Sequence, residues 1–247
     1  MVNGEIFGKE FVKKRELLQN LFFPPRCPVC DQVLWAGEKT CGPCGAKIRH
    51  ITEPCCKKCG KPLEDERREY CPDCAHKKHF YTQGKAVFVY QGGIRESMYR
   101  FKYANKREYA TFYAEEAYHL HGAWIKAKGI EVILPVPMYR KKERKRGYNQ
   151  AAVFARSLGK ISGIPVDQTL LSRVRNTVPQ KELNDKERRK NLEEAFVVSG
   201  RPVPYHSVLL VDDIYTTGST VDAIAEILRA EGVDVICFLS ISIGAGF

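Results

Sequence analysis

From residue 84 onward, short apolar runs alternate with segments whose apolar side chains recur at helical spacing. The apolar runs predict strands at residues 84–90, 131–137, 169–174, 195–199, 207–213 and 233–242. The segments with helical spacing predict helices at residues 91–103, 108–121, 149–160 and 219–231. Several of these strands are apolar at nearly every position, which is typical of a parallel sheet covered on both faces. The pattern therefore predicts an α/β fold built on a parallel sheet.

The first 26 residues show a separate pattern. Apolar residues recur near helical spacing through residues 5–22, and the pair Pro24-Pro25 ends the predicted helix. Such an amphipathic helix packs on its own protein or, alternatively, anchors to a membrane. We favour packing on the protein itself.

Residues 27–80 are poor in aliphatic side chains and rich in Cys, Pro, Gly and Lys. A segment of this composition cannot form an apolar core unaided, so a bound metal must hold it. The chain is therefore expected to divide into a helix and lead-in (1–26), a small metal-bound module (27–80) and an α/β domain (84–247).

The charge adds a further hint. Lys and Arg number 40 against 29 Asp and Glu, a formal net charge of +11, which favours an anionic partner or substrate. Two zinc ions, each bound by four thiolates, would lower that charge to about +7 and weaken the inference.

No apolar run approaches the roughly 20 residues that span a bilayer, so no transmembrane helix is expected. Charged residues between Lys9 and Arg15 interrupt any signal-peptide core. A cytoplasmic location follows as the expectation, and in a reducing compartment clustered cysteines are more often metal ligands than disulfides.

Nine of the ten cysteines lie between Cys27 and Cys74. Eight of them form four C-x-x-C pairs, and a two-residue gap lets both sulfurs reach one ion. The spacing predicts two structural zinc sites of four thiolates each, paired sequentially rather than cross-braced: Cys27, Cys30, Cys41 and Cys44; and Cys56, Cys59, Cys71 and Cys74.

Three residues near these pairs leave alternatives open. Cys55 could replace Cys56, but Cys56 begins a pair with Gly after its second cysteine, so Cys55 is expected to be free. His76 and His79 are expected to be exposed loop histidines, because thiolates already fill both sites. Seven basic residues of the module either form a surface that binds nucleic acid or only keep the small module solvated: Lys57, Lys58, Lys61, Arg67, Arg68, Lys77 and Lys78.

The stretch VLLVDDIYTTGST, residues 208–220, joins a buried strand to two aspartates, a loop of small hydroxyl residues and a helix. In an open parallel sheet, ligands bind where strands end. Small residues and a helix N-terminus suit one terminal phosphate. Carboxylates would repel that phosphate unless they contact sugar hydroxyls or a divalent cation.

Three other patterns explain this stretch less well. A Walker B strand needs a Walker A loop elsewhere, and the closest stretch, GEIFGKE, is one residue short and ends in Glu. The Rossmann G-x-G-x-x-G is absent. An ordinary helix N-cap accounts for one Asp or Thr, but not for two aspartates followed by five small residues.

At these residues the chain resembles the phosphoribosyl pyrophosphate (PRPP) motif of type I phosphoribosyltransferases. Other stretches resemble the ComF family of bacterial competence proteins, from about residue 18 to residue 245: LFFPPRCPVC, FKY, PVPMYRKKERKRGYNQA and LSRVRNTVPQKELNDKERRKNLEEAF. The resemblance implies a double zinc ribbon followed by a phosphoribosyltransferase domain.

The resemblance also implies roles for individual residues. Asp212 and Asp213 would hold the ribose hydroxyls, and five residues would cradle the 5-phosphate: Thr216, Thr217, Gly218, Ser219 and Thr220. Candidates for pyrophosphate contact, with Mg²⁺ bound alongside, or for a closing loop at 173–191 are Lys102, Arg140, Arg146, Arg175 and Gln180. Purine-salvage relatives of the hypoxanthine type carry a proposed proton-handling Asp where this chain has Thr216, so the acceptor and the catalytic residues stay unassigned.

Two functions follow from the resemblance. The first is a DNA-uptake factor that contacts single-stranded DNA and binds PRPP or a similar phosphosugar, with a competence helicase as a further partner. The alternative is an active Mg²⁺-dependent phosphoribosyltransferase acting on a nitrogen acceptor.

Overall fold

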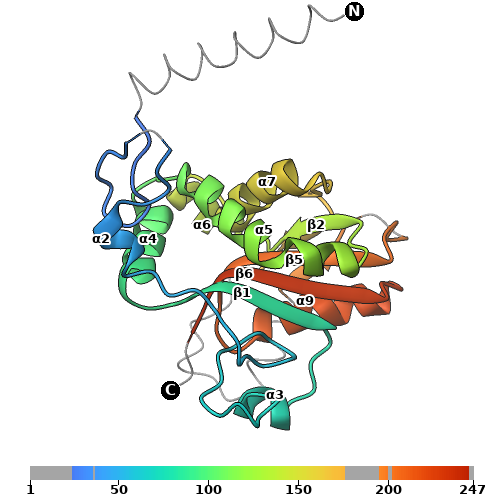
Figure 1. The fold of residues 1–247 in the computed structure, drawn as a ribbon. Coiled ribbons are helices and arrows are strands. Elements are labelled where there is room, and N and C mark those ends of the chain that lie inside the picture. Colours follow the sequence, from blue (N-terminus) through green and yellow to red (C-terminus); the bar gives the residue numbers. More distant parts are fainter. Residues whose placement is uncertain (1–23, 36, 176–194, 200–201, 245–247) are drawn as a thin grey trace, which may run out of the picture.

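The computed structural model describes residues 24–35, 37–175, 195–199 and 202–244 (Figure 1). The predicted helix at 5–22 lies outside these ranges, as does most of the loop at 173–191. Within the described ranges, none of the helices combines the length and the apolar character needed to cross a membrane.

A four-stranded parallel sheet forms the centre of the molecule. Its strands are β1 (Gln83–Val89), β2 (Val132–Pro135), β5 (Ser207–Tyr215) and β6 (Val235–Ile243), in the order β1-β6-β5-β2. Every neighbouring pair is parallel. The predicted parallel α/β sheet is confirmed.

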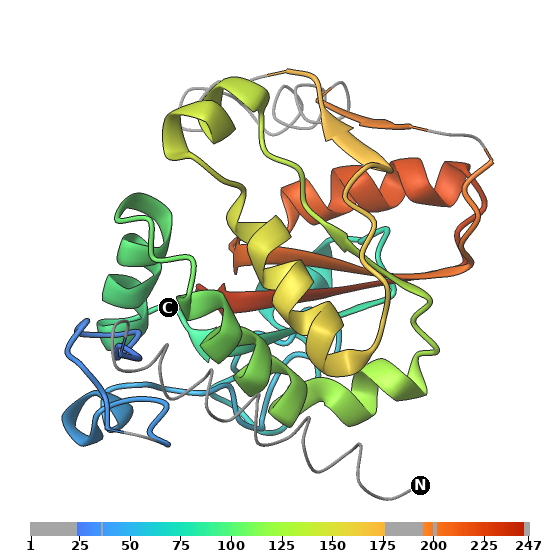
Figure 2. The same cartoon turned by 90° about the horizontal axis from the view of Figure 1, so that it is seen from above.

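Helices cover both faces of this sheet (Figures 1 and 2). One face carries α4 (Gly92–Tyr103), α5 (Tyr109–Ala127) and α7 (Gln150–Ser162), and the other carries α9 (Ser219–Ala230). Side chains of β5 alternate between the two cores: Leu209 packs in the cluster with α4, α5 and α7, while Leu210 packs in the cluster with α9. This alternation buries β5 on both faces, which is why its sequence reads as a continuous apolar run.

Two predicted strands pair outside the main sheet. β3 (Leu171–Arg173) and β4 (Phe196–Val198) form a two-stranded antiparallel sheet. Apolar patterning predicted both strands but held no information about this separate pairing, because partner choice depends on tertiary contacts.

The carboxyl ends of the parallel strands bring three segments to one edge of the sheet. β1 leads into α4, β2 leads into the short basic helix α6 (Arg140–Arg146), and β5 leads into the loop before α9. In Figure 2 the arrowheads of β5 and β6 point toward the side of the molecule on which α4 and α6 lie.

The cysteine-rich module contains the short helices α2 (Gly42–Gly45) and α3 (Pro72–His76). Each begins directly after a cysteine and has a proline in its first turn, where the missing N–H costs nothing. The part around α2 lies beside α4, and the part around α3 lies beyond the β1 edge of the sheet (Figure 1).

Candidate functional site

Two groups of four cysteines lie close enough to bind metal. They are Cys27, Cys30, Cys41 and Cys44, and Cys56, Cys59, Cys71 and Cys74, with the sulfurs of each group within 4.8 Å of one another. The Sγ atoms of Cys30 and Cys41 are 3.7 Å apart, as are those of Cys59 and Cys71. Two sulfurs that each lie about 2.3 Å from one tetrahedral ion would be about 3.8 Å apart, so the residues present suit zinc. The sequential pairing is confirmed.

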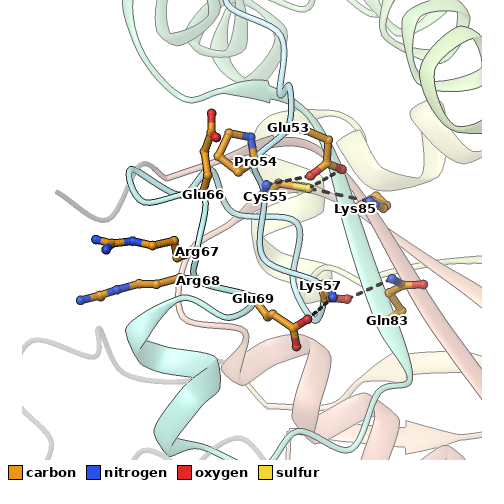
Figure 3. A pocket seen from close by; sticks show the side chains of 10 residues that line it. All are labelled: Glu53, Pro54, Cys55, Lys57, Glu66, Arg67, Arg68, Glu69, Gln83 and Lys85. Atoms are coloured by element: carbon orange, nitrogen blue, oxygen red, sulfur yellow. Dashed lines mark hydrogen bonds and ion pairs between the residues drawn. The ribbon is translucent and has the colours of Figure 1, made fainter.

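Cys55 stays outside the metal set. Its thiol lies 3.2 Å from a Glu53 carboxylate oxygen, to which it donates, and 3.9 Å from Nζ of Lys85 (Figure 3). Burial raises the pKa of the Cys55 thiol to about 11, which keeps it protonated and a poor ligand. The pocket around it is lined by the second ribbon and β1, and by none of the predicted sugar-phosphate residues.

His79 is not an exposed loop residue, so that expectation is wrong. Its side chain is 1% exposed. Its Nε2 lies 3.5 Å from Sγ of Cys74, and its Nδ1 lies 2.7 Å from a carboxylate oxygen of Asp222 in the first turn of α9. No sequence pattern predicts this contact, because His79 and Asp222 lie 143 residues apart in the chain. His76, by contrast, is exposed as expected.

Two further contacts join the second ribbon to α9 and to the loop before it. The backbone N–H of Phe80 donates to Asp222. The hydroxyl of Tyr81 lies 2.8 Å from the hydroxyl of Tyr215, which ends β5, and both rings pack on Phe238 of β6. The second zinc group therefore shares a core with the strand end that leads into the phosphate-type loop.

The loop from Tyr215 into α9 has the geometry of an anion cradle. Gly218 takes a left-handed conformation with φ of 77°, and a Cβ there would lie 2.3 Å from the Tyr215 hydroxyl, so the position requires glycine. No side chain caps the N-terminus of α9. Its first N–H groups thus face outward with the helix dipole behind them, and an anion can bind there.

Two acidic side chains stand beside this loop. The Asp213 N–H donates to a carboxylate oxygen of Asp212, and Asp213 pairs with Lys102 of α4 at 3.0 Å. Burial, together with the charge of Asp213, raises the pKa of Asp212 to about 7, while Lys102 and Arg173 act in the opposite direction. Lys102 thus lies at the acidic pair, although a lone lysine is usually a surface residue.

Basic side chains from α6 and β3 face the same region. Burial and the nearby charges of Arg173 and Arg146 lower the pKa of Lys142, and the charge of Arg173 also acts on Asp212. Arg146 donates to Gln150 at 2.7 Å. The other Gln150 amide atom, Nε2, is buried and finds no partner in the described part of the chain. This cluster can hold an anion next to the acidic pair.

Three other residues are candidates for pyrophosphate contact or for the closing loop: Arg140, Arg175 and Gln180. Arg140 is exposed at the start of α6, and Arg175 is exposed just before residue 176. Gln180 lies outside the described residues. Lys142 lies near Arg146, one helical turn along α6, and near Arg173, whose charge also acts on Asp212.

Asp212 supports a prediction about stability. Its pKa is raised above the ordinary 3.8, so its contribution to folding is complete below about pH 4 and is lost as the pH rises through 7. We therefore expect Asp212→Asn to unfold at a higher temperature than the wild type at pH 8, with the difference shrinking toward pH 5.5. Thermal unfolding at both pH values measures this, and Asp234→Asn, at a 77% exposed side chain, is the control. An equal difference at both pH values would contradict the prediction.

Several of the ribbon's basic side chains already have partners. Lys57 pairs with Glu69, Lys61 with Asp73, and Arg67 with Asp65. Lys58 donates to the carbonyl oxygens of Tyr81 and Thr82, and Lys77 pairs with Asp222. These contacts weaken the interpretation of the ribbon as a nucleic-acid face.

Comparison with known proteins covers both parts of the chain. Residues 18–75 match the family model of the double zinc ribbon domain. Competence protein F of Haemophilus influenzae is 32% identical over 225 residues, covering 87% of this chain and 95% of that protein. Competence protein ComFC of Bacillus subtilis is 27% identical, covering 83% and 89%. The DNA utilization protein YhgH of Salmonella typhimurium is also 27% identical, covering 85% and 86%.

Solved phosphoribosyltransferases show a weaker likeness. A purine phosphoribosyltransferase from Pyrococcus horikoshii matches 53% of this chain and 73% of its own, at 16% identity and a TM-score of 0.34. An adenine phosphoribosyltransferase matches 59% and 75%, at 16% identity and a TM-score of 0.35. A likeness of this size does not by itself assign an activity.

Proposed function

The chain belongs to the ComF family of competence proteins, and from that premise we propose that it is a DNA-uptake factor whose α/β domain binds PRPP or a similar phosphosugar and which contacts single-stranded DNA. Zinc would hold both ribbons. Cytoplasmic location and a competence helicase as partner belong to the same proposal.

One observation carries the phosphosugar part of the proposal. An acidic pair, Asp212 and Asp213, stands directly beside the uncapped N-terminus of α9. The carboxylates are acceptors for the ribose hydroxyls, and Thr216 to Thr220 would surround the 5-phosphate with N–H groups and hydroxyls. Lys102 and the α6 cations would contact the pyrophosphate, and Mg²⁺ bound alongside it would neutralise further charge.

Lys102 would change partners on binding. It pairs with Asp213 at 3.0 Å, and once ribose hydroxyls hydrogen-bond to this carboxylate, the Lys102 ammonium becomes available to an anionic group of the same ligand.

The proposed domain division places the zinc module at residues 27–80 and the phosphosugar site in the α/β domain at 84–247. Tyr81, in the segment between them, contacts Tyr215 at the end of β5.

Isothermal calorimetry with the zinc-loaded full chain tests the proposal. PRPP with Mg²⁺ is expected to give saturable heat, and ribose 5-phosphate a weaker signal, because it lacks the pyrophosphate that the cationic cluster contacts. If PRPP gives no heat with or without Mg²⁺, the phosphosugar part of the proposal is wrong.

Active phosphoribosyl transfer is the alternative. In that reaction a nitrogen acceptor attacks the ribose carbon as pyrophosphate leaves, and the protein positions the donor and neutralises the charge that develops on the leaving group. The cluster of Lys102, Lys142 and Arg146 suits that task. Pyrophosphate release in the presence of candidate bases distinguishes a transferase from a binding protein.

The DNA part of the proposal predicts a strong dependence on salt. Each phosphate contact releases counterions, with a slope of about −0.7 per contact for a single strand in a plot of log affinity against log salt. We expect a slope of about −2 or steeper for a labelled dT20 strand, measured by fluorescence anisotropy from about 50 to 300 mM salt. A flat slope would exclude contact with several phosphates.

A further inference from the structure

The outer face of α4 carries two exposed tyrosines. Tyr99 is 64% exposed and Tyr103 is 63% exposed, whereas Ile94, Met98 and Phe101 on the opposite side of the helix are fully buried. Residues four apart lie on one face of a helix, so the two rings stand together above the surface. Burial of an aromatic ring is favourable, and leaving two side by side in water calls for an explanation.

The two rings already lie against each other, with their planes tilted by 47°. Their centroids are 5.1 Å apart, and the guanidinium carbon of Arg146 lies 5.0 Å from the centroid of the Tyr103 ring. An aromatic ring beside a cation offers a flat face to a nucleobase and a charge to its phosphate. We refer to Tyr99 and Tyr103 as the tyrosine surface.

Positive charge surrounds the tyrosine surface. Residues 95–107 contain five basic residues and one acidic residue, and α6 contains six basic residues and one acidic residue. Within the part of the chain that the structure describes, none of the basic side chains of α6 forms an ion pair. The cations of α6 are therefore available to an outside anion, whereas Arg100, Lys102 and Lys106 pair with acidic side chains.

We propose that the tyrosine surface stacks bases of single-stranded DNA while the basic side chains of α6 contact its phosphates. The inference rests on the single-stranded DNA contact proposed above and names its surface. A duplex keeps its bases stacked inside and offers no face to Tyr99 or Tyr103. The core of a protein–protein interface is depleted of charge, and of lysine in particular, whereas the neighbours here are a dense set of cations that includes three lysines of α6.

The tyrosine surface also borders the proposed phosphosugar site. Lys102 is the residue before Tyr103 and reaches Asp213, while Arg146 contacts Tyr103 from α6. On the other side of α4, Arg100 donates to the carbonyl oxygen of Val29 in the first ribbon. Helix α4 therefore lies between the first ribbon and the acidic pair, with the tyrosine surface facing outward.

A double variant, Tyr99→Ala/Tyr103→Ala, tests the proposal. Stacking contributes about 1–3 kcal/mol per base, so we expect binding of labelled dT20 to weaken at least about tenfold at every salt concentration. The slope against salt should stay that of the wild type, because tyrosines neutralise no phosphate. Tyr99→Phe/Tyr103→Phe keeps the rings and should keep most of the affinity.

The controls separate stacking from general damage. Tyr70→Ala removes a tyrosine that is 45% exposed on the second ribbon, and it should bind dT20 like the wild type. An abasic strand of the same length should bind the wild type and the double variant equally. All variants should keep two zinc ions per chain and the unfolding temperature of the wild type, because Tyr99 and Tyr103 are exposed.

The outcomes distinguish this inference from the proposed function. If the wild type binds dT20 and the double variant binds it equally well, the proposed role of the tyrosine surface is wrong, but the proposed contact with single-stranded DNA is unaffected. If the double variant loses as much affinity for the abasic strand as for dT20, stacking is wrong. If the wild type binds neither strand, both the tyrosine surface and the DNA part of the proposed function are wrong.

Discussion

Replacing both acidic residues, Asp212→Asn/Asp213→Asn, is expected to weaken PRPP binding by about a hundredfold or more. Hydrogen bonds to charged groups contribute about 1.5–3 kcal/mol each, and each carboxylate would accept at least one from a ribose hydroxyl. Two such losses amount to at least about 3 kcal/mol, or two factors of ten. Calorimetry with Mg²⁺ and the zinc-loaded protein measures the change.

The structure supplies a matched control for this variant. Asp234→Asn makes the same chemical change at an exposed carboxylate beside His206, just before β6 begins at the opposite end of the sheet. It should leave PRPP binding unchanged. The double variant also removes the ion pair between Asp213 and Lys102, so its thermal unfolding is measured under the same conditions to show that it is folded. Equal affinity in the double variant and the wild type would show that the ligand, if any, binds elsewhere.

The local arrangement of the candidate site follows directly from the sequence. The strand, the two aspartates and the small-residue loop follow one another in the chain, so their proximity is fixed by β5 running directly into α9. The cysteine pairs are local in the same sense: each C-x-x-C is a tight turn, and each two-pair group spans fewer than 20 residues. Apolar patterning likewise located every strand of the main sheet.

Long-range contacts could not be predicted from one sequence. Lys102 reaches Asp213 across more than a hundred residues, and His79 reaches Asp222 across 143. Lys102 meets Asp213 because α4 follows the carboxyl end of β1, and His79 meets Asp222 because the second ribbon packs against α9. The spacing of a lone Lys or a lone His does not predict a contact of this kind, so the sequence alone predicts only an exposed loop position for His79.

Loss of the second zinc site, through Cys59→Ser/Cys71→Ser, is expected to have the largest effect on stability. Structural zinc contributes an apparent binding free energy of about 10–16 kcal/mol in small modules. Cys56, Cys59 and Cys71 pack in the same core cluster as the α9 face of the sheet. The variant should therefore contain one zinc per chain, measured by elemental analysis, and unfold at a much lower temperature.

The first site offers a contrast. Cys30→Ser/Cys41→Ser should also contain one zinc, but Cys27, Val29, Leu34 and Cys44 form a small cluster of their own, apart from the two cores of the sheet. Its loss should leave most of the stability of the α/β domain intact. If both variants lower the unfolding temperature of the α/β domain equally, the core that the second ribbon shares with the sheet does not add to the stability of the domain.

The second zinc site should also affect the phosphosugar loop, through residues that bind no metal. His79 connects the zinc thiolate of Cys74 to Asp222 in the first turn of α9, and Tyr81 holds the hydroxyl of Tyr215 at the end of β5. His79→Ala should keep two zinc ions yet bind PRPP more weakly, because Asp222 at the N-terminus of α9 loses one of its three contacts on the ribbon side and keeps only those of Lys77 and the Phe80 N–H. Tyr90→Phe, which removes a hydroxyl outside these contacts, serves as the control and should bind PRPP like the wild type. If His79→Ala binds PRPP as tightly as the wild type, the ribbon stabilises the domain without positioning the loop, and zinc acts on this protein through folding alone.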